Sequence, residues 1–220
     1  MGLGVRTAVL SRLAGVSRRV RTGVALTFDD GPMPGTTDAV LDALADLGVR
    51  ATFFCVGRNA ERHPALLGRI LSEGHAVGSH SHTHAPAGAQ SPRQLAEDYV
   101  RGRRAVEDAA GRRVALFRPP YGLLRPATIR TMRACETWTW SVDPADWRGD
   151  ADAASITAAL RDVDGGDVVL LHDWLEPQVP HSGDRSATIT SVRSLVGRLV
   201  AAGVPLVPLE GPTPAGDRST

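Results

Sequence analysis

Short apolar runs alternate along the chain with longer segments in which apolar residues recur every three or four positions. The short runs are typical of buried β-strands and the longer segments of amphipathic helices. The runs that predict strands occupy residues 24–28, 51–55, 75–78, 114–117, 137–142, 167–171 and 204–207. The segments that predict helices occupy residues 37–47, 59–72, 92–110, 126–134, 151–162 and 188–202. The chain is therefore expected to consist of repeated βα units.

Strands that alternate with helices pair in parallel, because each helix carries the chain back to the same end of the sheet. The pattern contains seven strand segments, and about seven βα units favour a barrel over an open doubly wound sheet. The expected fold class is α/β, a (β/α) barrel of parallel strands. Glycines such as Gly48 and Gly111 follow the helical segments where a left-handed cap is needed.

Polar residues with catalytic or ligating side chains follow the strand segments rather than interrupting them. After the first, third, fourth, fifth and sixth strands come, in order, Asp29 with Asp30, the histidines of the sequence GSHSHTHA, Arg118, Asp143 with Asp146, and His172 with Asp173. In a barrel of parallel strands these positions meet at one rim, which is the face where such folds place their active sites. Five loops are therefore expected to supply one polar cluster.

The composition narrows the class of protein. The chain has 220 residues, with 25 basic residues that are all arginine, 24 acidic residues and a formal charge of +1. A nucleic-acid-binding protein would show a basic surplus, so no nucleic-acid partner is expected. Cys55 and Cys135 lack the spacing of a metal or redox motif and are interpreted as buried thiols.

The two ends of the chain differ from its centre. Residues 1–22 are interpreted as an arginine-rich N-terminal arm, a short amphipathic helix or a tail lying on the domain, because arginines interrupt every apolar run. Residues 23–207 are expected to form one catalytic domain, and residues 208–220 a loose C-terminal tail. No membrane span is expected. The lack of a clear export signal favours a cytoplasmic protein, with secretion or cell-wall association as the alternative.

The histidine cluster raises the question of a metal site. On an extended strand His80, His82 and His84 would point the same way, whereas a helical turn would pair His80 with His84 only. Histidines in a loop are often simply solvated, and the Asp29–Asp30 pair in LTFDDGP also suits an ordinary turn. If His80 and His84 join Asp30, three protein ligands leave a position open for water, which is typical of a catalytic metal site.

The expected cofactor is one divalent metal ion. Imidazole and carboxylate donors suit Zn²⁺ first, and Co²⁺, Ni²⁺, Mn²⁺ or Fe²⁺ would fit the same donors. With Asp30 as a ligand, its neighbour Asp29 would remain free to act as a base.

Three further motifs have both a structural and a functional interpretation. FRPPYG reads as a rigid loop, which could also direct Arg118 and the backbone N–H of Tyr121 at one point. SVDPADW reads as an Asp-Pro turn with an aromatic residue, and VVLLHDW as a buried strand that ends in His172. Each motif alone is weak evidence for a catalytic site, whereas their order along the chain and their positions after strands are stronger evidence.

The chain resembles the polysaccharide deacetylase family, also called the NodB-homology domain or carbohydrate esterase family 4. The resemblance covers about residues 23–207, with five motifs in order: T-F-D-D-G-P, H-S-x-x-H, R-P-P-Y, D-x-x-D-W and L-L-H-D. It implies a distorted barrel of about seven βα units. It also implies hydrolysis of an N-acetyl group with no nucleophilic side chain.

The resemblance implies a role for each matching residue. The metal ligands would be Asp30, His80 and His84. Asp29 would be the catalytic base, positioned by Arg118, and His172 the general acid, oriented by Asp146. The backbone N–H of Tyr121 would bind the oxyanion, and substrate would contact Pro120, Tyr121, Trp147 and Leu170, the last two lining a pocket for the acetyl methyl group. His82 occupies a position that the motif leaves free.

The expected function is metal-dependent removal of N-acetyl groups from N-acetylglucosamine-containing glycans or oligosaccharides, of the peptidoglycan or chitin type. The alternative is an intracellular amidohydrolase of a small N-acylated metabolite. An acetylxylan esterase and a non-catalytic carbohydrate-binding domain are further interpretations. The expected partner is thus a glycan or an acylated small molecule, and the sequence leaves the oligomeric state open.

Overall fold

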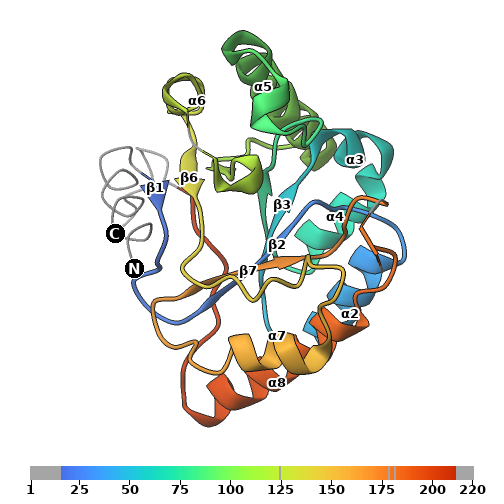
Figure 1. Cartoon of the computed structure of the whole chain (residues 1–220), viewed down its shortest axis with the longest axis vertical. Helices are drawn as coiled ribbons and strands as arrows, with labels where there is room; N and C mark the ends of the chain where they lie inside the picture. The colour runs from blue at the N-terminus through green and yellow to red at the C-terminus, as the bar shows by residue number, and fades with distance from the viewer. Residues whose placement is uncertain (1–15, 124, 178, 181, 212–220) are drawn as a thin grey trace.

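A computed structural model describes residues 16–211 apart from positions 124, 178 and 181 (Figure 1). Its centre is one sheet whose strand order is β1-β6-β5-β4-β3-β2-β7, with every neighbouring pair parallel. The strands are β1 (Val16–Ser17), β2 (Ala25–Asp29), β3 (Thr52–Cys55), β4 (Ala76–Ser79), β5 (Leu116–Phe117), β6 (Glu136–Trp138) and β7 (Val168–His172). The predicted α/β class with parallel strands is confirmed.

Helices lie outside the curled sheet, with α7 and α8 side by side (Figure 1). They are α2 (Thr36–Leu47), α3 (Gly57–Arg62), α4 (Pro64–Ser72), α5 (Pro92–Ala110), α6 (Pro126–Thr131), α7 (Ala153–Ala159) and α8 (Ser186–Ala201), with 3₁₀ turns η1 (Ala87–Ala89) and η2 (Pro120–Gly122). Gly48 and Gly111 adopt φ values of 64° and 62° at the ends of α2 and α5, as the sequence predicted.

The sheet is a distorted, incompletely hydrogen-bonded barrel. Val142, beyond the end of β6, forms a parallel bridge with Val169 of β7. The Val142 N–H donates to the Val168 carbonyl at 3.2 Å, and the Leu170 N–H donates to the Val142 carbonyl at 2.9 Å. The chain after β6 therefore reaches β7, the strand at the opposite end of the strand order.

The seventh strand is not the one that the sequence predicted. Residues 204–207 form only a single bridge, between Leu206 and Val24. Pro205 has no N–H to donate, so a regular ladder cannot extend through this segment. The strand at the edge of the sheet is instead β1, which pairs with β6 and lies within the predicted N-terminal arm. Residues 1–15 of that arm lie outside the described residues.

The predicted helix over residues 59–72 is two helices. Pro64 begins α4 directly after His63, whose φ of −130° and ψ of 53° break the helix. Proline suits the first turn of a helix, where its missing N–H is not needed, but not a helix interior. Both α3 and α4 contact α5.

The core lies between the sheet and its helices. Every residue of β2 and β7 is buried, as expected for strands covered on both faces. Cys55 and Cys135 are free and buried, as predicted. Leu209, in the predicted C-terminal tail, is buried, and its N–H donates to Thr52 Oγ1 at 2.8 Å, whereas residues 212–220 lie outside the described part. None of the described helices is long and apolar enough to cross a membrane.

Candidate active site

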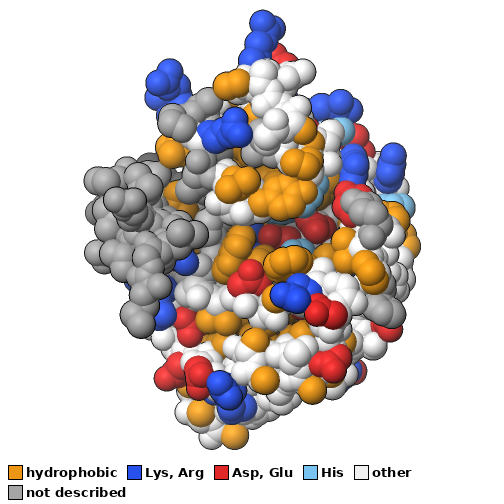
Figure 2. All heavy atoms as spheres, in the orientation of Figure 1, with side chains coloured by type: hydrophobic (Ala, Val, Ile, Leu, Met, Phe, Trp, Pro, Cys, Tyr) orange, Lys and Arg blue, Asp and Glu red, His pale blue; other side chains and the backbone are white. Residues whose placement is uncertain are grey.

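The carboxyl ends of the strands meet around a pocket. Figure 2 shows a hollow near the middle of one face, where acidic and histidine side chains lie among hydrophobic ones. The pocket has a volume of about 410 Å³. Its lining residues are Asp29, Asp30, His80, His84, Tyr121, Trp140, Asp143, Trp147, Leu170, His172, Leu175, Glu176 and Val179. The predicted convergence of polar residues at one rim is therefore present.

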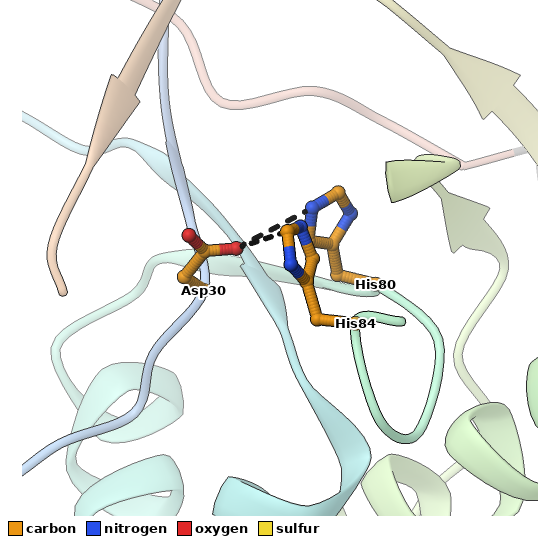
Figure 3. Close-up of side chains that lie close together, drawn as sticks. All are labelled: Asp30, His80 and His84. Carbon is orange, nitrogen blue, oxygen red and sulfur yellow. Dashed lines mark ion pairs between the residues drawn. The ribbon is translucent and has the colours of Figure 1, made fainter. Parts of the chain in front are cut away.

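Asp30, His80 and His84 bring three ligand atoms to one point (Figure 3). These atoms all lie within 4.8 Å of one another. Asp30 Oδ1 lies 3.6 Å from His80 Nε2 and 3.3 Å from His84 Nε2. This oxygen is buried and has no hydrogen-bond partner within the described residues. An unpartnered carboxylate oxygen facing two imidazole nitrogens fits a divalent cation.

Beyond Ser79, the backbone of the sequence GSHSHTHA is neither a strand nor a helix. The chain leaves β4 at Ser79, and Ser81 and His84 take left-handed φ values of 65° and 54°. Ser81 Oγ accepts the His84 N–H at 2.9 Å, which closes the loop. His82 points away from the other two histidines, because its Nε2 lies 3.1 Å from Glu61 Oε2 on α3. The tight loop therefore selects His80 and His84.

Burial keeps both imidazoles in the form that can bind a metal. It lowers the pKa of His84 to about 4 and that of His80 well below its ordinary value. His80 Nδ1 lies 2.8 Å from the Arg118 carbonyl, so this nitrogen carries the proton and Nε2 presents its lone pair toward Asp30. Burial also raises the pKa of Asp30 to about 7. A bound cation would compensate for the charge of this buried carboxylate.

Asp29 is held by a different partner from Asp30. Arg118 is fully buried, and its Nη1 donates to Asp29 Oδ1 at 2.7 Å and to Thr27 Oγ1 at 2.8 Å. The guanidinium carbon lies 4.1 Å from the centre of the Phe54 ring. Burial raises the pKa of Asp29 above its ordinary value, and the Arg118 charge opposes that rise. Asp29 is thus fixed beside the three ligand atoms.

His172 and Asp146 form a second buried pair. His172 Nδ1 lies 2.8 Å from Asp146 Oδ1, and the His172 N–H donates to Asp146 Oδ2 at 3.0 Å. Burial alone would lower the pKa of His172, but the Asp146 charge and hydrogen bond raise it to about 9. Arg185 also contacts Asp146, at 2.9 Å. Nothing in the sequence pattern distinguished Arg185 from the other arginines.

The predicted substrate-contacting residues lie at different depths. Leu170 and the half-exposed Trp147 line the pocket, and Trp147 Nε1 donates to Asp143 Oδ1 at 3.4 Å. Tyr121 has a left-handed φ of 57°, and its ring centre lies 4.8 Å from that of His84. Pro120 is buried in the η2 turn and does not line the pocket.

The pocket also contains residues to which the sequence assigned no individual role, although the loop from Leu175 to Arg185 could be interpreted either as a binding surface or as an irregular surface loop. Trp140 follows β6, and three more residues lie in the loop after His172: Leu175, Glu176 and Val179. Glu176 forms an ion pair with Arg58 of α3, which connects this loop to the segment after β3. An irregular loop has no periodicity from which these contacts could be predicted.

Comparison with known proteins identifies the family. Residues 18–139 match the family model described as polysaccharide deacetylase. The chain is 33% identical over 184 residues to a peptidoglycan-N-acetylglucosamine deacetylase of Bacillus cereus, covering 82% of this chain and 83% of that protein. It is 36% identical over 182 residues to a chitooligosaccharide deacetylase of Sinorhizobium fredii, covering 81% and 84%.

A solved structure supports the same assignment over a longer stretch than the family model. A peptidoglycan N-acetylglucosamine deacetylase in complex with 4-naphthalen-1-yl-N-oxidanyl-benzamide superposes with a TM-score of 0.81 at 28% identity. The match covers 92% of this chain and 94% of that one. It therefore extends beyond residue 139 and includes the β7 part of the sheet. This chain belongs to the polysaccharide deacetylase family.

Proposed function

We propose that this protein is a metal-dependent hydrolase that removes N-acetyl groups from N-acetylglucosamine-containing glycans or oligosaccharides. The observation that carries the proposal is the arrangement of two buried charged pairs, Asp29–Arg118 and His172–Asp146, around the Asp30, His80 and His84 group. Amide hydrolysis needs a base for water and an acid for the departing amine. The two pairs supply one of each at the same pocket.

Asp30, His80 and His84 would hold one divalent cation, and Zn²⁺ is the ion proposed. When bound, such a cation polarises the substrate carbonyl and makes water more acidic. Two neutral imidazoles and one carboxylate leave further coordination positions open, as a catalytic site requires. The rest of the mechanism follows from the side chains around this group.

Asp29 is suited to the role of base. Arg118 occupies its Oδ1, so Oδ2 is the oxygen that can accept a proton from the attacking water. Burial raises the pKa of this carboxyl group, which makes Asp29 a stronger base than an exposed aspartate. Arg118 keeps the side chain in one orientation throughout.

His172 is suited to the role of acid. With its pKa raised to about 9, His172 carries a proton at neutral pH. It can therefore protonate the nitrogen of the departing amino sugar as the C–N bond breaks. Acetate and a free amine are the products. The Tyr121 N–H is proposed to stabilise the negative charge on the carbonyl oxygen, with the acetyl methyl group against Leu170 and Trp147.

The carboxylates around the pocket suit the hydroxyl groups of a sugar. Four carboxylates, Asp29, Asp30, Asp143 and Glu176, are among its described lining residues, which include no arginine. Arg58 lies nearby but is paired with Glu176. Carboxylates accept hydrogen bonds from sugar hydroxyls. We therefore propose that these carboxylates help to bind the hydroxyl groups of an N-acetylglucosamine unit.

Acetate release from a panel of substrates tests the proposal. The panel contains chitooligosaccharides, peptidoglycan fragments, acetylxylan and small N-acylated metabolites, each incubated with protein of measured metal content. Acetate release from the chitooligosaccharides or peptidoglycan is expected. Turnover of the small metabolites alone would overturn the glycan assignment. No release from any member would overturn the hydrolase assignment.

A further inference from the structure

Arg185 is a buried arginine that contacts Asp146 at Oδ2, the oxygen that does not face the His172 ring. It precedes α8 and is only 6% exposed. Its Nη2 donates to Asp146 Oδ2 at 2.9 Å and to the Asp146 carbonyl at 3.0 Å, and lies 2.7 Å from Thr188 Oγ1. Its Nε donates to the His172 carbonyl at 3.2 Å. One guanidinium therefore connects the loop after β6, the end of β7 and the start of α8.

The contacts of Asp146 show what Arg185 contributes. The Asp146 side chain is completely buried, and Oδ1 faces His172 Nδ1. Oδ2 accepts the His172 N–H, the Thr188 hydroxyl at 3.0 Å and the Arg185 guanidinium. Burial alone would raise the pKa of Asp146, but the charges of His172 and Arg185 hold it below its ordinary value. Two cations thus share one carboxylate.

The charges of His172 and Arg185 behave differently during the proposed reaction. In the proposed mechanism His172 gives its proton to the amine and becomes neutral, whereas Arg185 keeps its charge. Without Arg185, Asp146 would then be a buried carboxylate without a counter-charge, which is strongly unfavourable. While His172 is protonated, Arg185 also weakens the hold of Asp146 on the imidazolium, because it draws on the same negative charge.

We propose that Arg185 is a positioning residue that fixes Asp146 for His172 and limits how tightly Asp146 retains the His172 proton. The inference rests on the proposed role of His172 as the acid. Arg185 does not line the pocket, and its contacts are with Asp146, Thr188 and the His172 carbonyl, so it can affect the His172 ring only through Asp146 and the backbone. A residue that merely anchored α8 would affect stability without affecting proton transfer.

Several charged groups around His172 affect the pKa that a titration of its ring would measure. Asp146 and Arg185 lie on one side, while Asp29 and Asp30 at the end of β2 raise the pKa of His172 from across the strand pair. His84 faces the same pocket. Replacing Arg185 changes one of these charges and leaves the others in place.

The experiment compares Arg185→Gln, Arg185→Lys and the control Arg193→Gln. Arg193 lies on α8 as well, but it is half-exposed and paired with Asp46 outside the site. The His172 ring is titrated by NMR in the metal-free protein. The metal-loaded protein is assayed on an acetamide sugar, whose amine must be protonated, and on an acetyl ester with a good leaving group. His172→Ala sets the size of the loss when the acid is absent.

Arg185→Gln is expected to raise the pKa of His172 and to lower kcat on the amide by roughly 10-fold. This loss is smaller than the loss of roughly 10²-fold or more expected for His172→Ala, because the acid is weakened and not removed. The ester rate should fall far less. Arg185→Lys restores the charge and part of the amide rate, while Arg193→Gln matches the wild type in both measurements. If Arg185→Gln does not fold, a reduced amide-to-ester ratio in Arg185→Lys supports the proposal and an unchanged ratio overturns it.

Two results would overturn the proposal: an unchanged His172 titration in Arg185→Gln, or equal losses on amide and ester with a lower melting temperature. Failure of the proposed function is a separate result. If the wild-type protein released no acetate from any substrate, the titration in the metal-free protein would still decide whether Arg185 controls the proton of His172.

Discussion

Two adjacent carboxylates, Asp29 and Asp30, have different surroundings at the end of β2. Asp29 accepts a hydrogen bond from Arg118, whereas Asp30 Oδ1 faces the His80 and His84 nitrogens. Asp29→Asn is therefore expected to keep one metal ion per chain and to lose activity by roughly 10²-fold or more, because the base is removed. Metal analysis and kcat on a chitooligosaccharide check this. The matched variant Asp30→Asn should lose the metal, and loss of metal from Asp29→Asn would contradict the division of roles.

The pH dependence of His172 is a second prediction at this scale. Its pKa is raised from 6.5 to about 9 in the folded protein, so its pairing with Asp146 stabilises the fold fully below pH 6.5 and is lost as the pH rises through about 9. Asp146→Asn removes the main cause of the rise. The alkaline decline of both amide hydrolysis and stability should move to lower pH in this variant. Rate and melting profiles at neutral and alkaline pH measure it, and an unmoved decline would exclude His172 as the group that titrates.

The sequence indicates which side chains can lie together where the spacing is local. Asp30 lies directly after a strand, and the four-residue separation of His80 and His84 selects two of the three histidines once the chain turns. Arg185 could not be predicted, because its partner Asp146 lies 39 residues earlier and its loop has no pattern. Side-chain contacts between distant loops depend on packing that the sequence pattern does not show.

At the scale of elements, helix α5 sets the position of the histidine loop. A Cβ on Gly102 would lie 2.1 Å from the Ser81 carbonyl carbon and 2.5 Å from the His82 nitrogen. Asp98, one turn earlier, accepts the His82 N–H at 3.2 Å and the Thr83 hydroxyl at 2.8 Å. The loop that carries His80 and His84, two of the proposed metal ligands, therefore rests directly on the helix backbone.

Gly102→Ala is expected to destabilise the protein by about 2 kcal/mol or more. A Cβ 2.1 Å from the Ser81 carbonyl carbon causes overpacking of about 3 kcal/mol or more, and the helix preference for alanine offsets only about 1 kcal/mol of it. Metal affinity should fall as well, since the loop must move. Chemical denaturation and metal competition measure the two effects. Gly68→Ala in α4 is the matched control: its Cβ would meet nothing within 4 Å, so a small gain in stability is expected. If Gly102→Ala changed neither the free energy of unfolding nor the metal affinity, the loop would have to move without cost, and the prediction would be wrong.

The elements themselves were predicted best where the pattern is long. Strands β2, β3 and β7 and helices α2 and α5 lie close to their predicted ranges, since each has a continuous apolar run or a sustained helical period. The two-residue strand β1 has no such pattern and exists through its pairing with β6. Pro64 is a sequence signal for the start of a helix, and it marks the boundary between α3 and α4.

At the scale of the whole molecule, the barrel brings together proposed metal ligands that are far apart in the chain. Asp30 follows β2, while His80 and His84 follow β4, and β3 lies between these strands in the sheet. The three donors meet only when the sheet has formed. A cation that binds them should therefore bind the folded state and not the unfolded chain.

Metal addition is thus expected to stabilise the entire fold. At a free metal concentration of 100 Kd the gain is about 2.7 kcal/mol, which raises Tm by roughly 5–10 °C for a chain of this size. Thermal melting with a chelator and with added Zn²⁺ measures the shift. His84→Ala should abolish it. His82→Ala should keep the full shift and one metal ion per chain, although loss of its contact with Glu61 lowers the starting Tm. If the shift disappeared in His82→Ala, the ligand set would have to include His82.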